Sequence, residues 1–398
     1  MHTSLGRKMF SMSTFRILWL FGFLSGFASG LIYPLLPLYA YSKGISSADV
    51  AFTYTIAFSV STLSLPAWGR LSDQLDKRNL LVLLSASVVI ILLLITFVSR
   101  LFDLTILYVM YFTFGGASNS ISAALATNIV MSTKMGREFG RWRISFSLGW
   151  IMATLFSGLL TDVFGFTSIF VLSAIATFFS ALCFRLLRGE PERQEPKKTS
   201  AIMPILRQRS LIIMYLAIFL IWVVNPSIDV FLPLYMYQPP LNAPKTLISI
   251  AFSLSAIAEV PAMLYFGVLS DRIGRKLILA LCFLAYPARL FLTAMPNDPI
   301  SILFVQLFHA LTFGGLYVVS TAYLSDIVPD EIRGTAISLY TMAMNFGTIL
   351  GSPIDGALVA IMSFKMMYIV MALYSFAPAL LFLIAGKETL HHTLKEKQ

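Results

Sequence analysis

Four ionisable side chains interrupt long apolar stretches in the second half of the sequence. They are Asp229, Glu259, Arg289 and His309, and Asp355 is a marginal fifth member of the set. Charged groups are costly in apolar surroundings unless they are paired, and the two acids, the arginine and the histidine would nearly neutralise each other if they converge. The alternative for His309 alone is a hydrogen-bonded residue that packs between helices. Carboxyl and imidazole groups beside an arginine can take up and release a proton. The four residues are therefore candidates for proton coupling.

A second group combines a cation, a hydroxyl and a large ring. Arg143, Ser147 and Trp150 are spaced i, i+4 and i+7, so a helix places them on one face. Such a face suits a small hydroxylated or aromatic solute, because rings stack on tryptophan and hydroxyls bind arginine. The alternative is an arginine near the end of its helix and a tryptophan that only packs. The other polar residues that we include in a candidate substrate site are Asn119, Asn128, Asn225, Gln306 and Asn345.

A short polar loop occurs twice, 198 residues apart. GRLSDQLDKRN at 69–79 returns as GVLSDRIGRK at 267–276, and LLPLYAY at 35–41 returns as FLPLYMY at 231–237. An aspartate at a helix end can bind an arginine or a helix N-terminus and so hold two halves of a protein closed. The basic residues alone could equally serve only to keep the loop on one side of a membrane. The residues that we assign to this gating function are Arg70, Asp73, Arg78, Asp271, Arg272 and Arg275.

The segments that must position these residues are long and apolar. Hydrophobic residues make up 58% of the 398 residues and charged residues 12%, about half the charged share of a typical soluble domain. Twelve segments are each long enough to cross ~30 Å of hydrocarbon. They lie at about 15–41, 47–69, 79–99, 104–132, 143–164, 167–187, 210–236, 246–266, 277–295, 299–325, 335–362 and 366–386.

Together the segments and the repeat predict an all-α membrane protein with twelve transmembrane helices in two pseudo-symmetric six-helix bundles. We expect the first bundle at 1–187, a charged cytoplasmic linker at 188–209 and the second bundle at 210–398.

The distribution of Lys and Arg predicts the orientation. With both termini in the cytoplasm, every basic residue lies inside except Lys43, Arg100, Lys245 and Lys365, which lie outside, and Arg289, which lies within a helix. We therefore expect a multi-pass protein of the cytoplasmic membrane. The net charge of +10 is then explained by topology, which argues against nucleic acid as a partner.

The repeated loop, G-x-L-S-D-x-x-x-[KR]-[KR], resembles the signature of the major facilitator superfamily, and the resemblance covers essentially the whole chain. It implies a twelve-helix transporter that works by alternating access. EFGRWRISFSLGW is similar to the helix-5 segment of the lactose permease group, which implies sugar contacts for Arg143 and Trp150. LFHALTFGG resembles the phenylpropionate permeases and nucleoside–proton symporters, and Glu259-Val260-Pro261 resembles the Glu-x-Pro of sugar-efflux and phenylpropionate-type members.

The resemblance also suggests how protons are carried. An arginine followed twenty residues later by a histidine matches Arg289 and His309, but the lactose permease has an acid one turn after its histidine where this chain has Thr312. We therefore expect Glu259 to titrate, Arg289 to adjust its proton affinity and His309 to link it to substrate. Asp229 is the rival proton carrier.

These observations predict a secondary active transporter of a small organic solute, such as a sugar, nucleoside or aromatic acid, that acts as a proton symporter. The alternative is an efflux pump, a proton antiporter for drug- or sugar-like compounds, and a receptor without transport is a third possibility. We expect no enzyme activity, because His2, His391 and His392 lie at the termini and His309 has no second histidine beside it to build a metal site. The expected partners are the solute, protons and the lipid bilayer, with a monomeric chain, no metal and no cofactor beyond the proton gradient.

Overall fold

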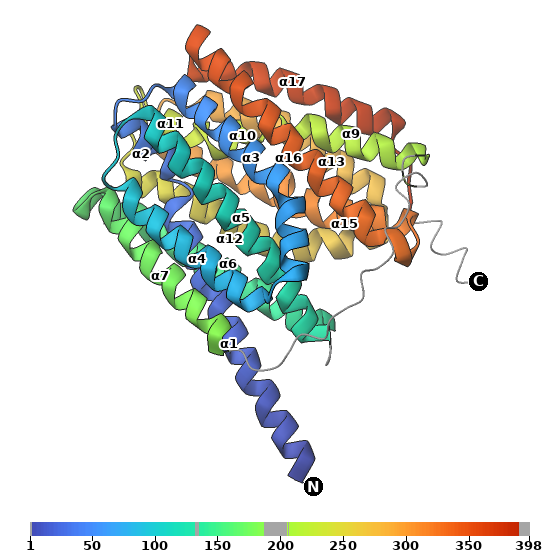
Figure 1. The fold of residues 1–398 in the computed structure, drawn as a ribbon. Coiled ribbons are helices and arrows are strands. Elements are labelled where there is room, and N and C mark those ends of the chain that lie inside the picture. Colours follow the sequence, from blue (N-terminus) through green and yellow to red (C-terminus); the bar gives the residue numbers. More distant parts are fainter. Residues whose placement is uncertain (1, 132–134, 187–204, 206, 390–398) are drawn as a thin grey trace. The chain divides into compact units, whose positions relative to one another are not determined.

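The computed structural model describes residues 2–131, 135–186, 205 and 207–389, and within these ranges every regular element is a helix (Figure 1). The elements are α1 (His2–Ile32), α2 (Leu36–Ser42), α3 (Ser47–Gln74), α4 (Lys77–Ile95), α5 (Leu101–Met131), α6 (Met135–Phe164), α7 (Phe166–Leu186), α9 (Arg209–Trp222), α10 (Asn225–Asp229), α11 (Phe231–Tyr237), α12 (Lys245–Ile273), α13 (Arg275–Ala294), α14 (Pro299–Val305), the 3₁₀ turn η1 (Gln306–Phe308), the π-helix η2 (Ala310–Gly315), α15 (Leu316–Ile327), α16 (Asp330–Ile361) and α17 (Phe364–Ala385).

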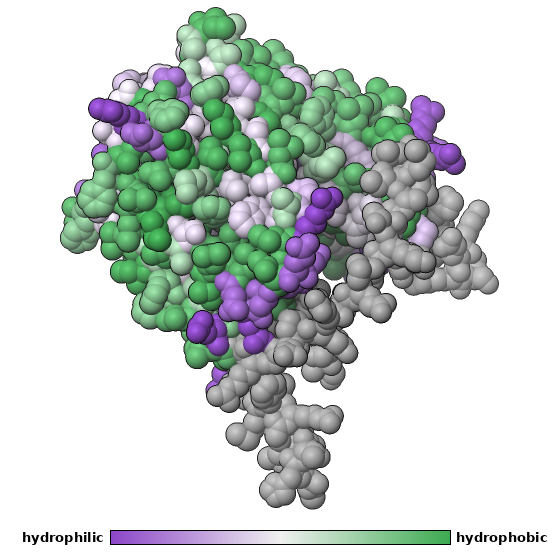
Figure 2. Space-filling view, in the orientation of Figure 1, coloured by the Kyte–Doolittle hydropathy of each residue, from purple (hydrophilic) through white to green (hydrophobic). Residues whose placement is uncertain are grey.

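Twelve helical stretches of the described chain are long and apolar enough to cross a membrane. This confirms the predicted fold class. Large apolar side chains are exposed along them, including Leu83, Ile90, Leu264 and Phe304, and green apolar surface covers most of the face in Figure 2. Such a surface is unfavourable in water, so hydrocarbon is its natural solvent.

Three of the spans are interrupted. The first is divided into α1 and α2, the seventh into α9, α10 and α11, and the tenth by η1 and η2. Pro37 lies in the first turn of α2, and Pro226 in the first turn of α10. A proline has no N–H to donate and therefore interrupts the ladder of helical hydrogen bonds. The repeated LPLY sequences form matching seven-residue helices, α2 and α11.

Close contact between helices positions the candidate residues. In α1, a Cβ at Gly26 would overlap the carbonyl oxygen of Phe146, and at Gly149 in α6 it would overlap that of Phe23. Glycine allows the two backbones to touch, a packing mode common in membrane proteins. These contacts fix the rotation of α6, the helix that carries Arg143, Ser147 and Trp150.

The described chain forms two compact units. Unit 1 consists of the described residues within 1–45, 56–194 and 244–253, and unit 2 of those within 46–55, 195–243 and 254–398. The buried core of unit 1 includes Leu18, Phe21, Leu84 and Phe184. That of unit 2 includes fully buried tyrosines. Most of the expected linker at 188–209 lies outside the described residues, so the division into 1–187 and 210–398 stays a prediction.

Candidate functional site

Arg289 is the centre of a buried polar cluster in unit 2. It lies on α13 and is only 2% exposed. Its guanidinium donates to Gln306 Oε1 at 2.8 Å, to Thr312 Oγ1 at 2.8 Å and approaches His309 Nδ1 at 3.0 Å. All three partners come from the tenth span. A buried cation is thus surrounded by neutral acceptors, which compensate in part for its lost hydration.

The hydrogen bonds fix the tautomer of His309. A guanidinium has donors only, so Nδ1 of His309 must accept and the ring proton must lie on Nε2. Nε2 faces Glu259 Oε2 on α12 at 3.5 Å. The side chains of Glu259 and His309 are 21% and 18% exposed, whereas Arg289 is enclosed. The result is a chain from a partly accessible carboxyl, through an imidazole, to a buried cation.

The irregular tenth span makes this arrangement possible. Gln306 begins a 3₁₀ turn, and Thr312 lies in the π-helix that follows His309. In a straight α-helix the side chains of residues 306, 309 and 312 would spread over a wide arc, since each residue turns the helix by about 100°. The change of winding brings all three onto one guanidinium. Tyr286 donates its hydroxyl to the Thr312 carbonyl at 2.6 Å and thereby satisfies a backbone group within the π-helix.

Asp229 joins the cluster through its charge. Asn225 Nδ2 donates to Asp229 Oδ2 at 2.6 Å in the short helix α10, and the charge of Asp229 acts on Arg289 and His309. Three of the four predicted proton-coupling residues are therefore linked by direct contact, and the fourth lies within electrostatic range. Their roles in proton transfer stay predictions.

A row of rings that is not among the predicted site residues lies beside this cluster. His309, Phe313 and Tyr317 are spaced i, i+4 and i+8, and their planes are parallel to within 6°, with centroids 5.2 and 5.9 Å apart. Trp222 lies against Phe313 with a centroid distance of 6.3 Å. The aromatic spacing along 309–317 was the signal that could have revealed it.

The predicted substrate residues of unit 1 share one face of α6. The Arg143 guanidinium lies 5.3 Å from the ring of Phe146, the Ser147 hydroxyl donates to the Arg143 carbonyl, and the Trp150 ring lies 5.1 Å from that of Tyr33. Arg143 is exposed and Trp150 half-buried.

The other predicted substrate residues are scattered. Asn119 is exposed on α5, and the side chain of Asn128 lies outside the described part of the structure. Asn225 and Asn345 are half-buried on α10 and α16, and Gln306 is bound to Arg289. Their contact with a solute stays a prediction.

The two copies of the repeated loop begin their following helices in different ways. In the first copy Asp76 is the N-cap of α4, and its Oδ1 accepts from the amides of Arg78 and Asn79 at 2.9 and 2.8 Å. Asp73 is 77% exposed and lies 3.8 Å from Lys77. Arg70 is exposed as well. This copy makes only local contacts within the residues described.

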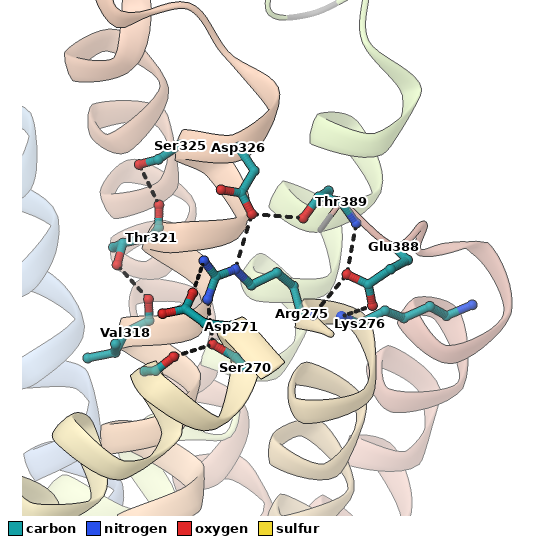
Figure 3. A network of polar contacts seen from close by, with 11 residues as sticks. Ser270, Asp271, Arg275, Lys276, Val318, Thr321, Ser325, Asp326, Glu388 and Thr389 are labelled. Carbon is teal, nitrogen blue, oxygen red and sulfur yellow. Dashed lines mark hydrogen bonds and ion pairs between the residues drawn. The ribbon is translucent and has the colours of Figure 1, made fainter. Parts of the chain in front are cut away.

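The second copy is part of a larger network (Figure 3). Arg275 lies 2.5 Å from Asp271 and 3.1 Å from Asp326, and it donates to the Ser270 hydroxyl at 2.6 Å. Arg272 is exposed. Asp271 and Arg275, both assigned to gating, thus pair with each other within one copy of the loop. Their gating role stays a prediction.

Gly274 occupies the N-cap position of α13, with φ of +108°. Glu388 supplies the missing carboxylate: Oε1 accepts from the Arg275 amide at 2.9 Å and Oε2 from the Lys276 amide at 3.0 Å. A Cβ on Gly274 would lie 2.5 Å from Glu388 Oε2, so glycine is needed for both its backbone conformation and this close approach.

Twelve apolar spans and ionisable groups buried within them define a polytopic membrane protein of the transporter class. The model of the MFS_1 like family matches residues 15–385, and the chain belongs to that family. No group of three or more His, Cys, Asp or Glu among the described residues is close enough to hold a metal ion.

Curated relatives are similar over most of their length. The chain is 26% identical to the multidrug resistance protein MdtG of Proteus mirabilis, over 86% of this chain and 88% of the relative. It is 25% identical to the uncharacterized MFS-type transporter YuxJ of Bacillus subtilis, over 93% and 97%. It is 24% identical to sugar efflux transporter A of Dickeya chrysanthemi, over 87% and 89%.

Solved structures share the fold at lower identity. The nucleoside transporter NupG is 16% identical with a TM-score of 0.81, covering 94% of this chain and 98% of that one. A bacterial homologue of the human lysosomal transporter Spinster is 13% identical with a TM-score of 0.78, covering 97% and 98%. At these identities the likeness supports the fold alone.

Proposed function

We propose that this protein is a proton-coupled secondary transporter of a small organic solute and that it acts as a symporter in the cytoplasmic membrane, with both termini in the cytoplasm. The chain Glu259–His309–Arg289 carries the proposal. An acid, an imidazole and a buried cation in contact within membrane-spanning helices are expensive to maintain, and such groups usually mark an ion or proton path.

Glu259 is the proton acceptor in this proposal, because it is the partly accessible acid that directly contacts His309. When Glu259 is ionised, its charge attracts the Nε2 proton of His309, and Nδ1 remains fixed on Arg289. When Glu259 takes a proton from water, that attraction weakens and the imidazole is released. A movement of the imidazole would also alter its stacking on Phe313, the next ring in the row. Arg143, Ser147 and Trp150 on α6 are the proposed solute contacts in unit 1.

The direction of transport has a second candidate. MdtG is named for multidrug resistance and the Dickeya chrysanthemi protein for sugar efflux, and both are similar to this chain over more than four fifths of its length. These relatives support a proton antiporter for drug- or sugar-like compounds. Both modes would use the same carboxyl, because a proton on Glu259 can accompany the solute or replace it.

Transport assays on the reconstituted protein distinguish symport from antiport. Purified protein would first be screened by thermal shift against sugars, nucleosides and aromatic acids, since a ligand at 100 times its Kd stabilises by ~2.7 kcal/mol. The best ligand is then followed in proteoliposomes with an imposed pH gradient. Accumulation on the alkaline side indicates symport, and accumulation on the acidic side indicates antiport.

Glu259→Gln is expected to keep solute counterflow, which needs no net proton movement, and to abolish accumulation driven by the pH gradient. Asp103→Asn, an acid in the first turn of α5, is the matched control and should accumulate solute as the parent does. If accumulation survives Glu259→Gln and fails in Asp229→Asn, the proton site belongs to α10. Accumulation that survives both substitutions contradicts the proposed coupling.

A further inference from the structure

Asp355 is a buried acid that the proposed coupling chain does not use. It lies on α16, and none of its surface is exposed. Among the residues that the structure describes, no other Asp or Glu is buried. Ordinary packing has no need of a carboxyl, because an apolar residue of similar size would cost less to enclose.

The two oxygens of Asp355 differ in their contacts. Oδ2 accepts a hydrogen bond from the Ser227 hydroxyl on α10 at 2.7 Å. Oδ1 has no hydrogen-bond partner among the described residues. On the other side of Ser227, the Tyr368 hydroxyl donates to its carbonyl oxygen at 2.7 Å. Ser227 is thus bound through both its hydroxyl and its backbone carbonyl. Asp355 Oδ1 is the oxygen that could accept or carry a proton without breaking a bond described here.

No cation in the described structure balances a charge on Asp355. None of the ion pairs among those residues includes it. The titratable side chains described on the surrounding elements are Asp49, Tyr54, Arg70 and Asp73 on α3, Arg209 and Tyr215 on α9, Asp229 on α10, Tyr317, Tyr323 and Asp326 on α15, and Lys365, Tyr368 and Tyr374 on α17, and α16 itself carries Arg333 and Tyr340. Arg70 and Asp73 are exposed.

Of these groups, Tyr368 is linked to Asp355 through Ser227, which it contacts at the backbone carbonyl. Asp229 is held by Asn225, Asp326 by Arg275, and Lys365 and Arg209 are exposed. A carboxylate in this position would therefore be an isolated buried charge with one hydrogen bond. Such a state costs far more than a neutral acid, so the side chain carries a proton here.

The side of α16 that carries Asp355 is packed closely against the seventh span. One turn earlier on α16, a Cβ at Gly351 would overlap the carbonyl oxygen of Val223, and at Gly347 it would lie 2.5 Å from that of Phe219. The backbone of α16 is therefore pressed against α9 and the break that follows it. That break, at Val223 and Val224, and the second one at Val230 are places where the seventh span can bend.

We propose that Asp355 is a second proton-binding site of this transporter, occupied in the arrangement described here and emptied when α10 and α16 move apart. Opening the contact admits water to Oδ1, the O–H bond breaks, and the proton leaves to that water while the carboxylate becomes hydrated. Closing the contact reverses the step. The link to transport rests on the proposed function, but proton binding itself does not.

Infrared spectroscopy of the purified full-length protein tests the binding step. A protonated carboxylic acid has a C=O stretch distinct from that of a carboxylate and of amides. We expect the parent to show such a band near neutral pH, Glu259→Gln to keep it, and Asp355→Asn to lose it. Ser227→Ala should shift the band by removing its hydrogen bond, which keeps the test valid if Asp355→Asn folds poorly. A band that is unchanged in both Asp355→Asn and Ser227→Ala overturns the proposal.

Proteoliposomes test the link to transport. We expect Asp355→Asn to keep counterflow and to move one proton fewer per solute than the parent. An unchanged proton-to-solute ratio overturns the proposed link. If the parent moves no protons while the band is present, the proposed function fails and the binding site stands. Replacing sodium by choline tests whether Asp355 binds sodium instead of a proton. A sodium-dependent thermal shift that disappears in Asp355→Asn identifies a sodium site and contradicts a proton site.

Discussion

Asp76 and Glu388 both cap the N-terminus of a helix, and the two helices, α4 and α13, follow equivalent copies of the repeated loop. Asp76 accepts hydrogen bonds from the first free amides of α4, and Glu388 accepts those of α13. The residue that corresponds to Asp76 in the second copy of the loop is Gly274, which has no side chain to offer. The first helix is therefore capped from within its own loop and the second by a residue 113 positions beyond Arg275.

This difference predicts unequal effects of losing each carboxylate. Asp76→Ala should destabilise the protein by ~1 kcal/mol, the usual cost of losing an N-cap. Glu388→Ala should cost at least as much, because it removes bonds to two amides and a negative charge at a helix N-terminus. Thermal unfolding in detergent measures both. Lys387→Ala, at the exposed neighbouring residue, is the control and should leave the midpoint unchanged.

Gly274→Ala is expected to be more harmful than Glu388→Ala. It adds a Cβ at a φ of +108° and pushes against the carboxylate that caps α13. Combining Gly274→Ala with Glu388→Ala should relieve the collision but not the backbone strain. A double variant less stable than the sum of the two single changes would contradict this account.

The two aspartates of the repeated loop should respond differently to substitution. Asp73 is exposed and pairs with Lys77 at 3.8 Å, so Asp73→Asn should change stability by less than ~1 kcal/mol. Asp271 contacts the enclosed Arg275, and Asp271→Asn should have the larger effect. If the loops hold one side of the transporter closed, both variants should bind solute and transport it more slowly. Unchanged rates in both would leave the loops with a topological role only.

Arg289 should not be replaceable by lysine. Its planar guanidinium reaches Gln306, Thr312 and His309 at once, whereas an ammonium is a point charge that cannot reproduce this fork. The loss of a hydrogen bond to a charged group, ~1.5–3 kcal/mol, would slow transport by roughly 10- to 150-fold if the bond is needed in the rate-limiting step. Arg185→Lys on α7 is the matched control. Transport by Arg289→Lys at the parent rate would contradict the arrangement.

Trp150 should contribute directly to solute affinity. Trp150→Ala is expected to weaken binding of the identified ligand by ~1–3 kcal/mol, and Trp150→Phe should retain part of it because a ring remains. Trp19→Ala removes an exposed tryptophan that stacks on Phe23 and serves as the control. Equal affinity in Trp150→Ala and Arg143→Lys would place the solute elsewhere. Isothermal titration provides the measurement.

Impermeant thiol labelling checks the proposed orientation. Cysteines at the exposed positions Lys43 and Lys365 should react from outside the cell, and cysteines at Arg70 and Arg272 should not. The reverse pattern would invert the topology.

Sequence pattern predicted the spans because length and hydropathy are local properties. The seventh segment, expected at 210–236, is the stretch Arg209–Tyr237. Its division into α9, α10 and α11 was harder to predict, because a proline marks a possible break in a helix without fixing the geometry of that break. The winding change at Gln306–Gly315 has no simple signature, yet it decides which side chains reach Arg289. The cap by Glu388 depends on a contact between distant residues, which periodicity cannot reveal.

The dependence of α13 on Glu388 has a consequence for how the protein is made. At about 5–20 residues per second, the ribosome adds the 113 residues from Arg275 to Glu388 in about 6–23 s. During that interval the start of α13 has left the ribosome with two amides that still lack their carboxylate, while α4 was complete as soon as it emerged. The N-terminus of α13 is therefore completed only after Glu388 has been synthesised, whereas that of α4 needs no residue from beyond its own loop.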